Sequence, residues 1–154
     1  MTSVFVDTNV LLYSEDVSNP AKQARAIDWL RALWLRRLGR LSTQMLDEIY
    51  SNATRKLKPP MPPMPPMPQG DARAEVRRYQ RWQPWLLDHA TVETAWSVQS
   101  RFSLIYRDAL IVAAAQAQDC RYLLSEGVQH QQVMDQMQTI NPFLVGPEML
   151  DATG

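Results

Sequence analysis

Short apolar runs alternate with longer amphipathic segments along this chain. The runs Val4–Val6 and Tyr122–Leu124 are built from large apolar residues, and each stops at a polar residue, Asp7 or Ser125. Runs of this length and composition predict buried strands. The same criteria predict three weaker strands, at Arg40–Leu41, around Trp85–Leu87 and from Thr139–Ile140.

The longer segments carry apolar residues at helical spacing. A helix is predicted from Asn19-Pro20, where asparagine caps and proline takes the first position, to Gly39. A second begins at Ser42 or Thr43 and runs to about Lys58, with its apolar face formed by Leu46, Tyr50, Ala53 and Leu57. Further helices are predicted to begin at Asp71, to cover Thr91–Arg101 and to follow Asp108. Strands alternating with helices predict an α/β fold with a mostly parallel central sheet and helices on both faces.

A Pro-Pro-Met repeat interrupts this pattern within the segment 59–70. Proline lacks the backbone donor and the freedom that helices and sheets need, so the segment is expected to be an exposed polyproline-II insert. Neither flank looks self-sufficient, and a length of 154 residues suits one compact domain. We therefore expect a single domain, 1–154, with this insert and a C-terminal tail at 144–154.

The composition of the chain restricts which kinds of binding site and which compartment are expected. The 16 basic and 16 acidic residues cancel, which gives no support for a strongly basic nucleic-acid binder but leaves room for acidic and basic patches. A single cysteine, Cys120, suits a reducing compartment, and two histidines, His89 and His130, cannot complete a Cys/His zinc site. The N-terminus lacks a secretory pattern, and no apolar run reaches membrane-spanning length. We expect a cytoplasmic protein with no membrane association.

Three carboxylates are placed where a parallel sheet forms its ligand site. Asp7 ends the first strand, Glu126 follows a later one, and Asp108 stands at the start of a helix. Carboxylates that converge repel one another unless a cation neutralises them. Oxygen ligands suit Mg²⁺ or Mn²⁺, and such an ion activates water for phosphodiester hydrolysis.

Each of these residues also has a purely structural interpretation. An aspartate that ends a strand is commonly a turn or capping residue, and Asp108 is a suitable helix cap. Glu48 lies opposite the predicted apolar stripe of its helix, so periodicity alone predicts a surface glutamate. Spacing by itself therefore leaves both interpretations open.

Longer strings of residues resemble a known family. Val4–Tyr13 resembles the opening of a PIN domain, Ser42–Tyr50 with Thr54–Leu57 resembles its second-helix motif, and Asp108–Ala115 resembles the third. Leu123–Glu126, together with Asn141–Phe143, is similar to the closing segment of VapC-type toxins. Four strings in this order, from Val4 to Phe143, form a specific signal that no single string would give.

The resemblance implies a three-layer α/β/α PIN-like fold and an acidic metal site. On that pattern Asp7, Glu48 and Asp108 match the metal-coordinating carboxylates, and Thr8, Asn9 and Ser125 are the polar residues expected to orient the site. The resemblance further implies a Mg²⁺- or Mn²⁺-dependent ribonuclease that cleaves single-stranded or loop RNA. Its implied partners are a second copy of the chain, in a homodimer, and a VapB-like antitoxin.

One departure from the family falls at the site itself. The family usually has Ser-Glu-Asp in the closing segment, whereas this chain has Ser125-Glu126-Gly127. Either Glu126 turns inward as the fourth acid or a second metal position is weak. Arg55 and Lys56 are candidate RNA contacts, with a solvated helix face as the equal alternative.

The sequence thus predicts a metal-dependent endoribonuclease of the toxin type. The first alternative is a catalytically weakened PIN-like protein that acts as a protein- or RNA-binding module. A third interpretation is a metal-dependent phosphatase or a receiver-like domain. The phosphatase would favour an Asp-x-Asp pair where this chain has Asp7-Thr8-Asn9, and a receiver would have adjacent acids before the first strand.

Overall fold

The computed structural model describes residues 2–55 and 65–152, and its centre is a mostly parallel sheet. Within these ranges the sheet has five strands in the order β2-β1-β3-β5-β4. The parallel strands are β1 (Val4–Val6), β2 (Gly39–Arg40), β3 (Tyr122–Leu124) and β5 (Met137–Ile140). A short strand, β4 (Val133–Met134), pairs antiparallel with β5 at one edge. The predicted sheet type is confirmed.

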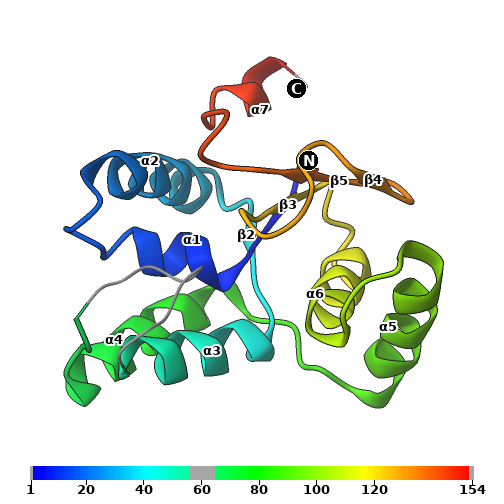
Figure 1. Ribbon diagram of the computed structural model, residues 1–154, viewed down its shortest axis with the longest axis horizontal. Helices are drawn as coiled ribbons and strands as arrows, with labels where there is room; N and C mark the ends of the chain where they lie inside the picture. Colours follow the sequence, from blue (N-terminus) through cyan, green and yellow to red (C-terminus); the bar gives the residue numbers. More distant parts are fainter. Residues whose placement is uncertain (1, 56–64, 153–154) are drawn as a thin grey trace.

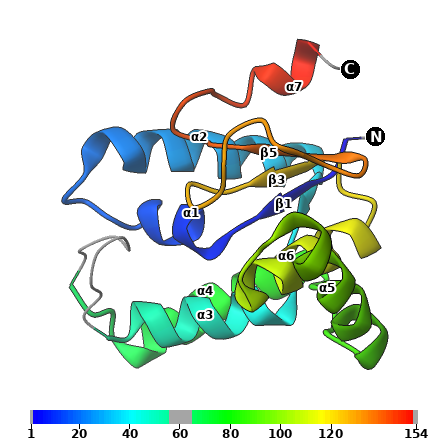
Figure 2. The same cartoon turned by 45° about the vertical axis from the view of Figure 1, so that its right-hand side comes forward.

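Helices cover both faces of this sheet, as Figures 1 and 2 show. One face carries α2 (Pro20–Arg36), with α7 (Met149–Ala152) near the C-terminus on the same side. The opposite face carries α3 (Thr43–Ala53), α4 (Gln69–Tyr79), α5 (His89–Phe102) and α6 (Tyr106–Ala117). A short helix, α1 (Thr8–Tyr13), continues directly from the end of β1. The α/β/α architecture is confirmed, and none of the described helices is long and apolar enough to cross a membrane.

The central strands owe their apolar sequences to burial on both faces. Val4, Phe5 and Val6 are fully buried, and β3 is buried along its whole length. Helix α2 begins as predicted, because the Asn19 side chain accepts a hydrogen bond from the backbone N–H of Lys22. The rigid centre of the sheet therefore fixes the residues that follow β1 and β3.

Several element boundaries differ from the sequence prediction. Strand β2 lies one residue earlier than expected, and Trp85 forms an isolated bridge with Ser42 instead of a strand. Helix α4 begins at Gln69, so Asp71 lies in its first turn and is not its cap. Helix α5 begins at His89, where the Asp88 side chain caps it. Strand β4 and helix α1 were not predicted, because neither has a long enough apolar pattern of its own.

The predicted apolar face of α3 is partly wrong. The helix buries Met45, Ile49, Asn52 and Ala53, of which only Ala53 was predicted, whereas Leu46 and Tyr50 are half-buried. Leu57 lies outside the described residues. The buried stripe is thus shifted by one position, which brings Glu48 to the border of the core. Helix α3 ends at Ala53 with Thr54 as its cap, earlier than the predicted end near Lys58.

The Pro-Pro-Met insert is shorter than predicted at its far end. Residues 59–64 lie outside the described part of the chain, so that portion of the prediction stays untested. Met67 packs beside Leu12, Ala53 and Ala72, and its backbone N–H donates to the carbonyl of Ala53 at 2.6 Å. Gln69 already belongs to α4. The insert is therefore anchored to the fold before it enters the next helix.

Candidate functional site

Asp7 is fixed at the carboxyl end of β1 by the two strands around it. Val6 pairs with Leu124, so the residues that follow β1 and β3, Asp7 and Ser125, lie side by side. The Ser125 hydroxyl donates to Oδ2 of Asp7 at 2.7 Å, and the backbone N–H of Thr8 donates to Oδ1 at 2.6 Å. The Asp7 side chain is 5% exposed. This carboxylate is both the cap of α1 and a buried, oriented charge.

Glu48 reaches the same place from α3. The Thr8 hydroxyl donates to its Oε1 at 3.0 Å, and the Gln44 side-chain amide donates to its Oε2 at 3.3 Å. The Glu48 side chain is 23% exposed, which the sequence-based assignment to the solvent face did not predict. Helix α3 packs against α1, and this contact brings a residue from the middle of one helix beside the start of the other.

Arg107 joins all three predicted carboxylates, and the sequence analysis did not identify it. Its Nη2 lies 2.9 Å from Oδ1 of Asp7 and 2.6 Å from Oε1 of Glu48. Its Nε lies 3.2 and 3.1 Å from the two oxygens of Glu48, and its Nη1 lies 3.1 Å from Oδ1 of Asp108. The carboxylates therefore gather around one guanidinium. We call the four residues Asp7, Glu48, Asp108 and Arg107 the acidic centre.

The electrostatics of the acidic centre follow from burial and from unequal charge. Burial raises the pKa of Asp108, and the charges of Asp7 and Glu48 raise it further, while Arg107 opposes both. Burial disfavours the charge of Arg107, yet Asp7 and Glu48 outweigh it and raise its pKa. With all groups ionised, three negative charges face one positive charge. The centre therefore carries a surplus of negative charge in a partly buried position.

The donors of the acidic centre fit a hard divalent cation chemically. Carboxylate oxygens are suitable ligands for Mg²⁺ or Mn²⁺. Gln44, whose amide donates to Glu48, keeps its Oε1 buried without a hydrogen-bond partner among the described residues. As the side chains lie, no three Asp, Glu, His or Cys residues in ranges 2–55 and 65–152 are arranged to hold a metal. The guanidinium of Arg107 lies among the carboxylates, so a shared cation would require it to leave.

Glu126 does not take the inward position that was expected of a replacement fourth acid. Both of its carboxylate oxygens accept hydrogen bonds from Nζ of Lys22 at 2.9 Å, and this ammonium also lies over the rings of Tyr13 and Phe143. Within the described residues, no hydrogen bond or ion pair joins Glu126 to Asp7. At the next position, the backbone N–H of Gly127 donates to the Ser125 hydroxyl at 3.1 Å.

The other predicted residues divide into those that contact the acidic centre and those that do not. Thr8 and Ser125 hydrogen-bond its carboxylates as expected, whereas Oδ1 of Asn9 makes no hydrogen bond within the described part of the chain. Arg55 is exposed just beyond the end of α3 and donates to the Asn52 side chain at 2.8 Å. Lys56 lies outside the described residues.

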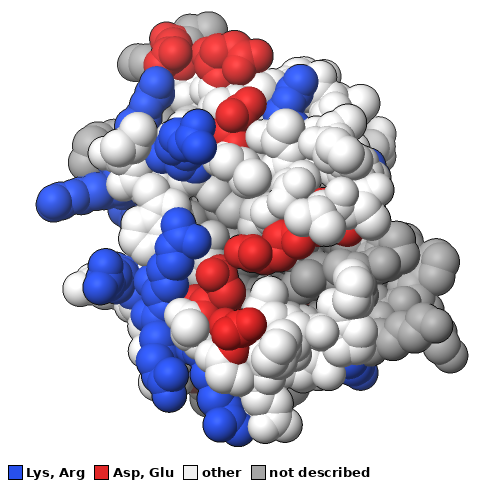
Figure 3. Space-filling model, turned by 90° about the vertical axis from the view of Figure 1, so that its left-hand side faces the viewer, with Lys and Arg blue, Asp and Glu red and all other residues white. Residues whose placement is uncertain are grey.

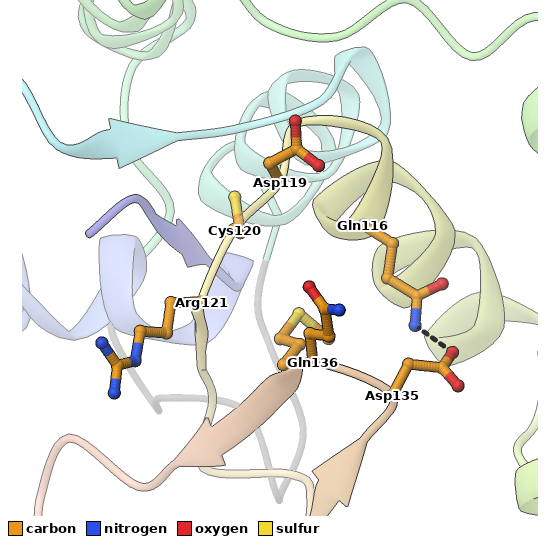
Figure 4. Close-up of a pocket in the computed structure, with 7 residues that line it drawn as sticks. Gln116, Asp119, Cys120, Arg121, Asp135 and Gln136 are labelled. Atoms are coloured by element: carbon orange, nitrogen blue, oxygen red, sulfur yellow. Dashed lines mark hydrogen bonds between the residues drawn. The ribbon is translucent and has the colours of Figure 1, made fainter. Parts of the chain in front are cut away.

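A separate cavity of about 570 Å³ lies near the opposite end of the sheet, where the chain enters β3 (Figure 4). Asp135, one of the two acids that line it with Asp119, is paired with Arg101 and Gln116, and Arg121 points away from Asp135 and Gln136 in the figure. Cys120 is 5% exposed, and burial raises the pKa of its thiol to about 12. A protonated, buried thiol is a poor nucleophile, so this cavity lacks the reactive groups of the acidic centre.

Comparison with known proteins identifies the fold family. The sequence matches the PIN domain over residues 4–134, and no curated protein matches it. Similar solved structures include a toxin–antitoxin complex from Klebsiella pneumoniae (14% identity, TM-score 0.54, 91% of this chain and 98% of that chain) and FitAcB from Neisseria gonorrhoeae (16%, 0.57, 92% and 99%). A third is VapBC2 from Rickettsia felis bound to a DNA fragment from its promoter (11%, 0.58, 90% and 97%). At these identities the structures show a shared fold, and the sequence match shows that this chain belongs to the PIN-domain family.

Proposed function

We propose that this protein is a metal-dependent endoribonuclease that hydrolyses RNA phosphodiester bonds. PIN domains are generally nucleases, which supports hydrolysis of a nucleic acid. The observation that carries the proposal is the convergence of Asp7, Glu48 and Asp108, from three distant segments, on a single cationic group. A structural cap would need one carboxylate, whereas three in one place are the donor set of a divalent-cation site.

In the proposed mechanism Asp7 and Asp108 would hold Mg²⁺ or Mn²⁺ directly, and Glu48 would hold it directly or through water. The chemistry that such an ion would supply is neutralisation of a phosphate oxygen and activation of water for in-line attack. Ser125 and Thr8 fix the orientation of Asp7 and Glu48 through the hydrogen bonds described above. Asn9, whose buried Oδ1 has no hydrogen-bond partner among the described residues, is proposed to help orient the site when it is occupied. Glu126, paired with Lys22, has no part in this mechanism.

The substrate is proposed to be RNA, the class that the resemblance implies. Binding of a nucleic acid is supported by the segregation of positive and negative side chains on the surface despite the zero net charge. Figure 3 shows a continuous column of Lys and Arg side chains beside a row of acidic ones. One cavity near strand β2 is lined by Arg37, Arg40 and Arg81 and by no acidic residue. Arg55 and Lys56 remain further candidates for phosphate contacts, which would make RNA affinity fall with salt.

The proposed biological setting is a toxin–antitoxin pair in the cytoplasm. The similar structures include a toxin–antitoxin complex, FitAcB and VapBC2. Ile105 and Tyr106, directly before Arg107, are 65% and 41% exposed, so apolar surface is available beside the acidic centre. We propose that a cognate antitoxin covers this surface and that the toxin itself forms a homodimer.

The test is a Mg²⁺ titration with labelled single-stranded RNA and the variant Asp7→Asn. Asparagine keeps the shape of the cap but removes one negative charge, so cleavage should fall below about one hundredth of the wild-type rate while the circular dichroism spectrum is unchanged. The matched control is Asp135→Asn, which alters an exposed pair far from the centre and should cleave normally. An undiminished rate in Asp7→Asn would overturn the proposed site.

A second candidate function is a binding module that has lost catalysis. It is favoured by Gly127, which stands where the family usually has an acid, and by the neutralisation of Glu126 by Lys22. Metal-dependent RNA binding without cleavage at any Mg²⁺ or Mn²⁺ concentration would support this module. Cleavage that stops on addition of EDTA would exclude it.

A further inference from the structure

The guanidinium of Arg107 uses the same oxygens that a divalent cation would need. It binds Oδ1 of Asp7, Oε1 of Glu48 and Oδ1 of Asp108, at 2.9, 2.6 and 3.1 Å. Charge-assisted hydrogen bonds of this length are the strong ones, and two of them end on partly or fully buried carboxylates. One oxygen cannot both hold a short bond to a guanidinium and ligate a metal at the same moment in the same direction. The guanidinium and the divalent cation therefore compete for the same carboxylate oxygens.

The position of Arg107 allows it to leave without disturbing the core. Its side chain is 37% exposed, in contrast to 5% for Asp7. It lies in the first turn of α6, directly after Ile105 and Tyr106, both of which are exposed. The long, flexible arginine stem can thus rotate toward solvent while the carboxylates stay fixed by Ser125 and Thr8.

A displaced Arg107 can pair with an anion, and the substrate brings one. The guanidinium presents paired N–H donors that match the oxygens of a phosphate group. An RNA phosphate bound beside the carboxylates would accept hydrogen bonds from the Arg107 guanidinium that the metal displaces. Metal and RNA would then favour each other's binding, because each stabilises the arrangement in which Arg107 has left the carboxylates.

We propose that Arg107 competes with the catalytic cation for these carboxylates. RNA draws Arg107 away from the carboxylates, so that metal and RNA bind cooperatively. This inference rests on the proposed function, since it concerns the same site. Arg107 acts as a positioning residue in this scheme, and it regulates the occupancy of the site through its contacts with Asp7 and Glu48. The free protein would hold metal weakly, and the RNA complex would hold it tightly.

The first test measures Mn²⁺ binding by electron paramagnetic resonance of the free ion, without RNA. Arg107→Gln should bind Mn²⁺ at least about tenfold more tightly than the wild type, because the competing bonds are gone. Arg107→Lys, which keeps the charge but loses the fork of donors, should lie between the two. The control Arg101→Gln removes an exposed arginine that is bound to Asp135 in the same two-pronged way, and it should bind Mn²⁺ like the wild type.

The second test adds a 2′-O-methyl RNA oligonucleotide that resists cleavage. In the wild type it should tighten Mn²⁺ binding several-fold, and in Arg107→Gln it should have little further effect. Should Arg107→Gln fail to fold in EDTA, Mn²⁺ should restore its folding, because the metal then neutralises the three carboxylates. Failure of Mn²⁺ to do so would count against the inference.

These outcomes separate the inference from the proposed function. Equal Mn²⁺ affinities in Arg107→Gln and the wild type would overturn the competition, even if the wild type cleaves RNA normally. Tighter binding in Arg107→Gln, with no cleavage of RNA by any variant, would support the competition and refute the nuclease.

Discussion

Two clusters of a cation with carboxylates stand at the carboxyl ends of the neighbouring strands β1 and β3, and they are built differently. After β3, Glu126 meets a single cation, Lys22, and the two side chains are 27% and 32% exposed. After β1, three carboxylates share Arg107, and the first of them, Asp7, is 5% exposed. One pair is balanced in charge and partly solvated. The other has surplus negative charge, and one of its carboxylates, Asp7, is almost completely buried.

The difference indicates which acidic residue at a sheet edge is able to bind a metal ion. A carboxylate with its own ammonium has little left for a metal, and partly exposed pairs of this kind contribute weakly to stability. A group with more acids than cations stays electrostatically strained until a further positive charge arrives. Both clusters follow a strand, so position in the fold does not distinguish them. The number of carboxylates for each cation distinguishes them.

The largest difference between the two clusters is expected when one acid in each is neutralised. Glu48→Gln removes a ligand from the acidic centre and should lower both Mn²⁺ affinity and RNA cleavage by about 10- to 100-fold. The matched change Glu126→Gln should alter cleavage less than about twofold, because Lys22 already neutralises that carboxylate. The measurements are Mn²⁺ binding and initial rates with labelled RNA. If Glu126→Gln were the more damaging change, the fourth-acid role of Glu126 would be restored.

A smaller effect is expected from the hydroxyl that connects the two strand ends. Ser125→Ala removes the 2.7 Å hydrogen bond to Asp7 without changing any charge. It should weaken Mn²⁺ binding by about tenfold, the usual cost of losing an orienting contact behind a metal ligand. The control Ser103→Ala changes an exposed serine at the end of α5 and should leave Mn²⁺ binding unchanged. Wild-type affinity in Ser125→Ala would show that Asp7 is positioned by its backbone alone.

Much of the framework could be predicted because its signals are local. The apolar runs of β1 and β3, and the asparagine and proline at the start of α2, each carry their structure within a few residues. Asp7 and Ser125 then follow from the rule that parallel strands end at a common edge. The candidate metal ligands Asp7, Glu48 and Asp108 came from the resemblance, and the structure brings their carboxylates together around Arg107.

The features that the sequence does not predict depend on contacts between distant segments. On α3, Leu46 and Tyr50 fit a helical stripe as well as Met45 and Ile49 do, and the packing against α1 decides between them. Arg107 looks like an ordinary surface arginine in sequence, because its partners Asp7 and Glu48 lie 100 and 59 residues away. Nothing near Glu126 indicates that Lys22, 104 residues earlier, neutralises it.

We propose that one divalent cation binds among Asp7, Glu48 and Asp108. Anomalous diffraction of crystals grown with Mn²⁺ and the uncleavable oligonucleotide tests this binding. We expect one strong peak in direct contact with Asp7 and Asp108, with Glu48 joined to it directly or through one water, and with Arg107 turned toward a phosphate. A peak at Glu126 instead, or saturating Mn²⁺ with Arg107 still bound to Asp7 and Glu48, would contradict it.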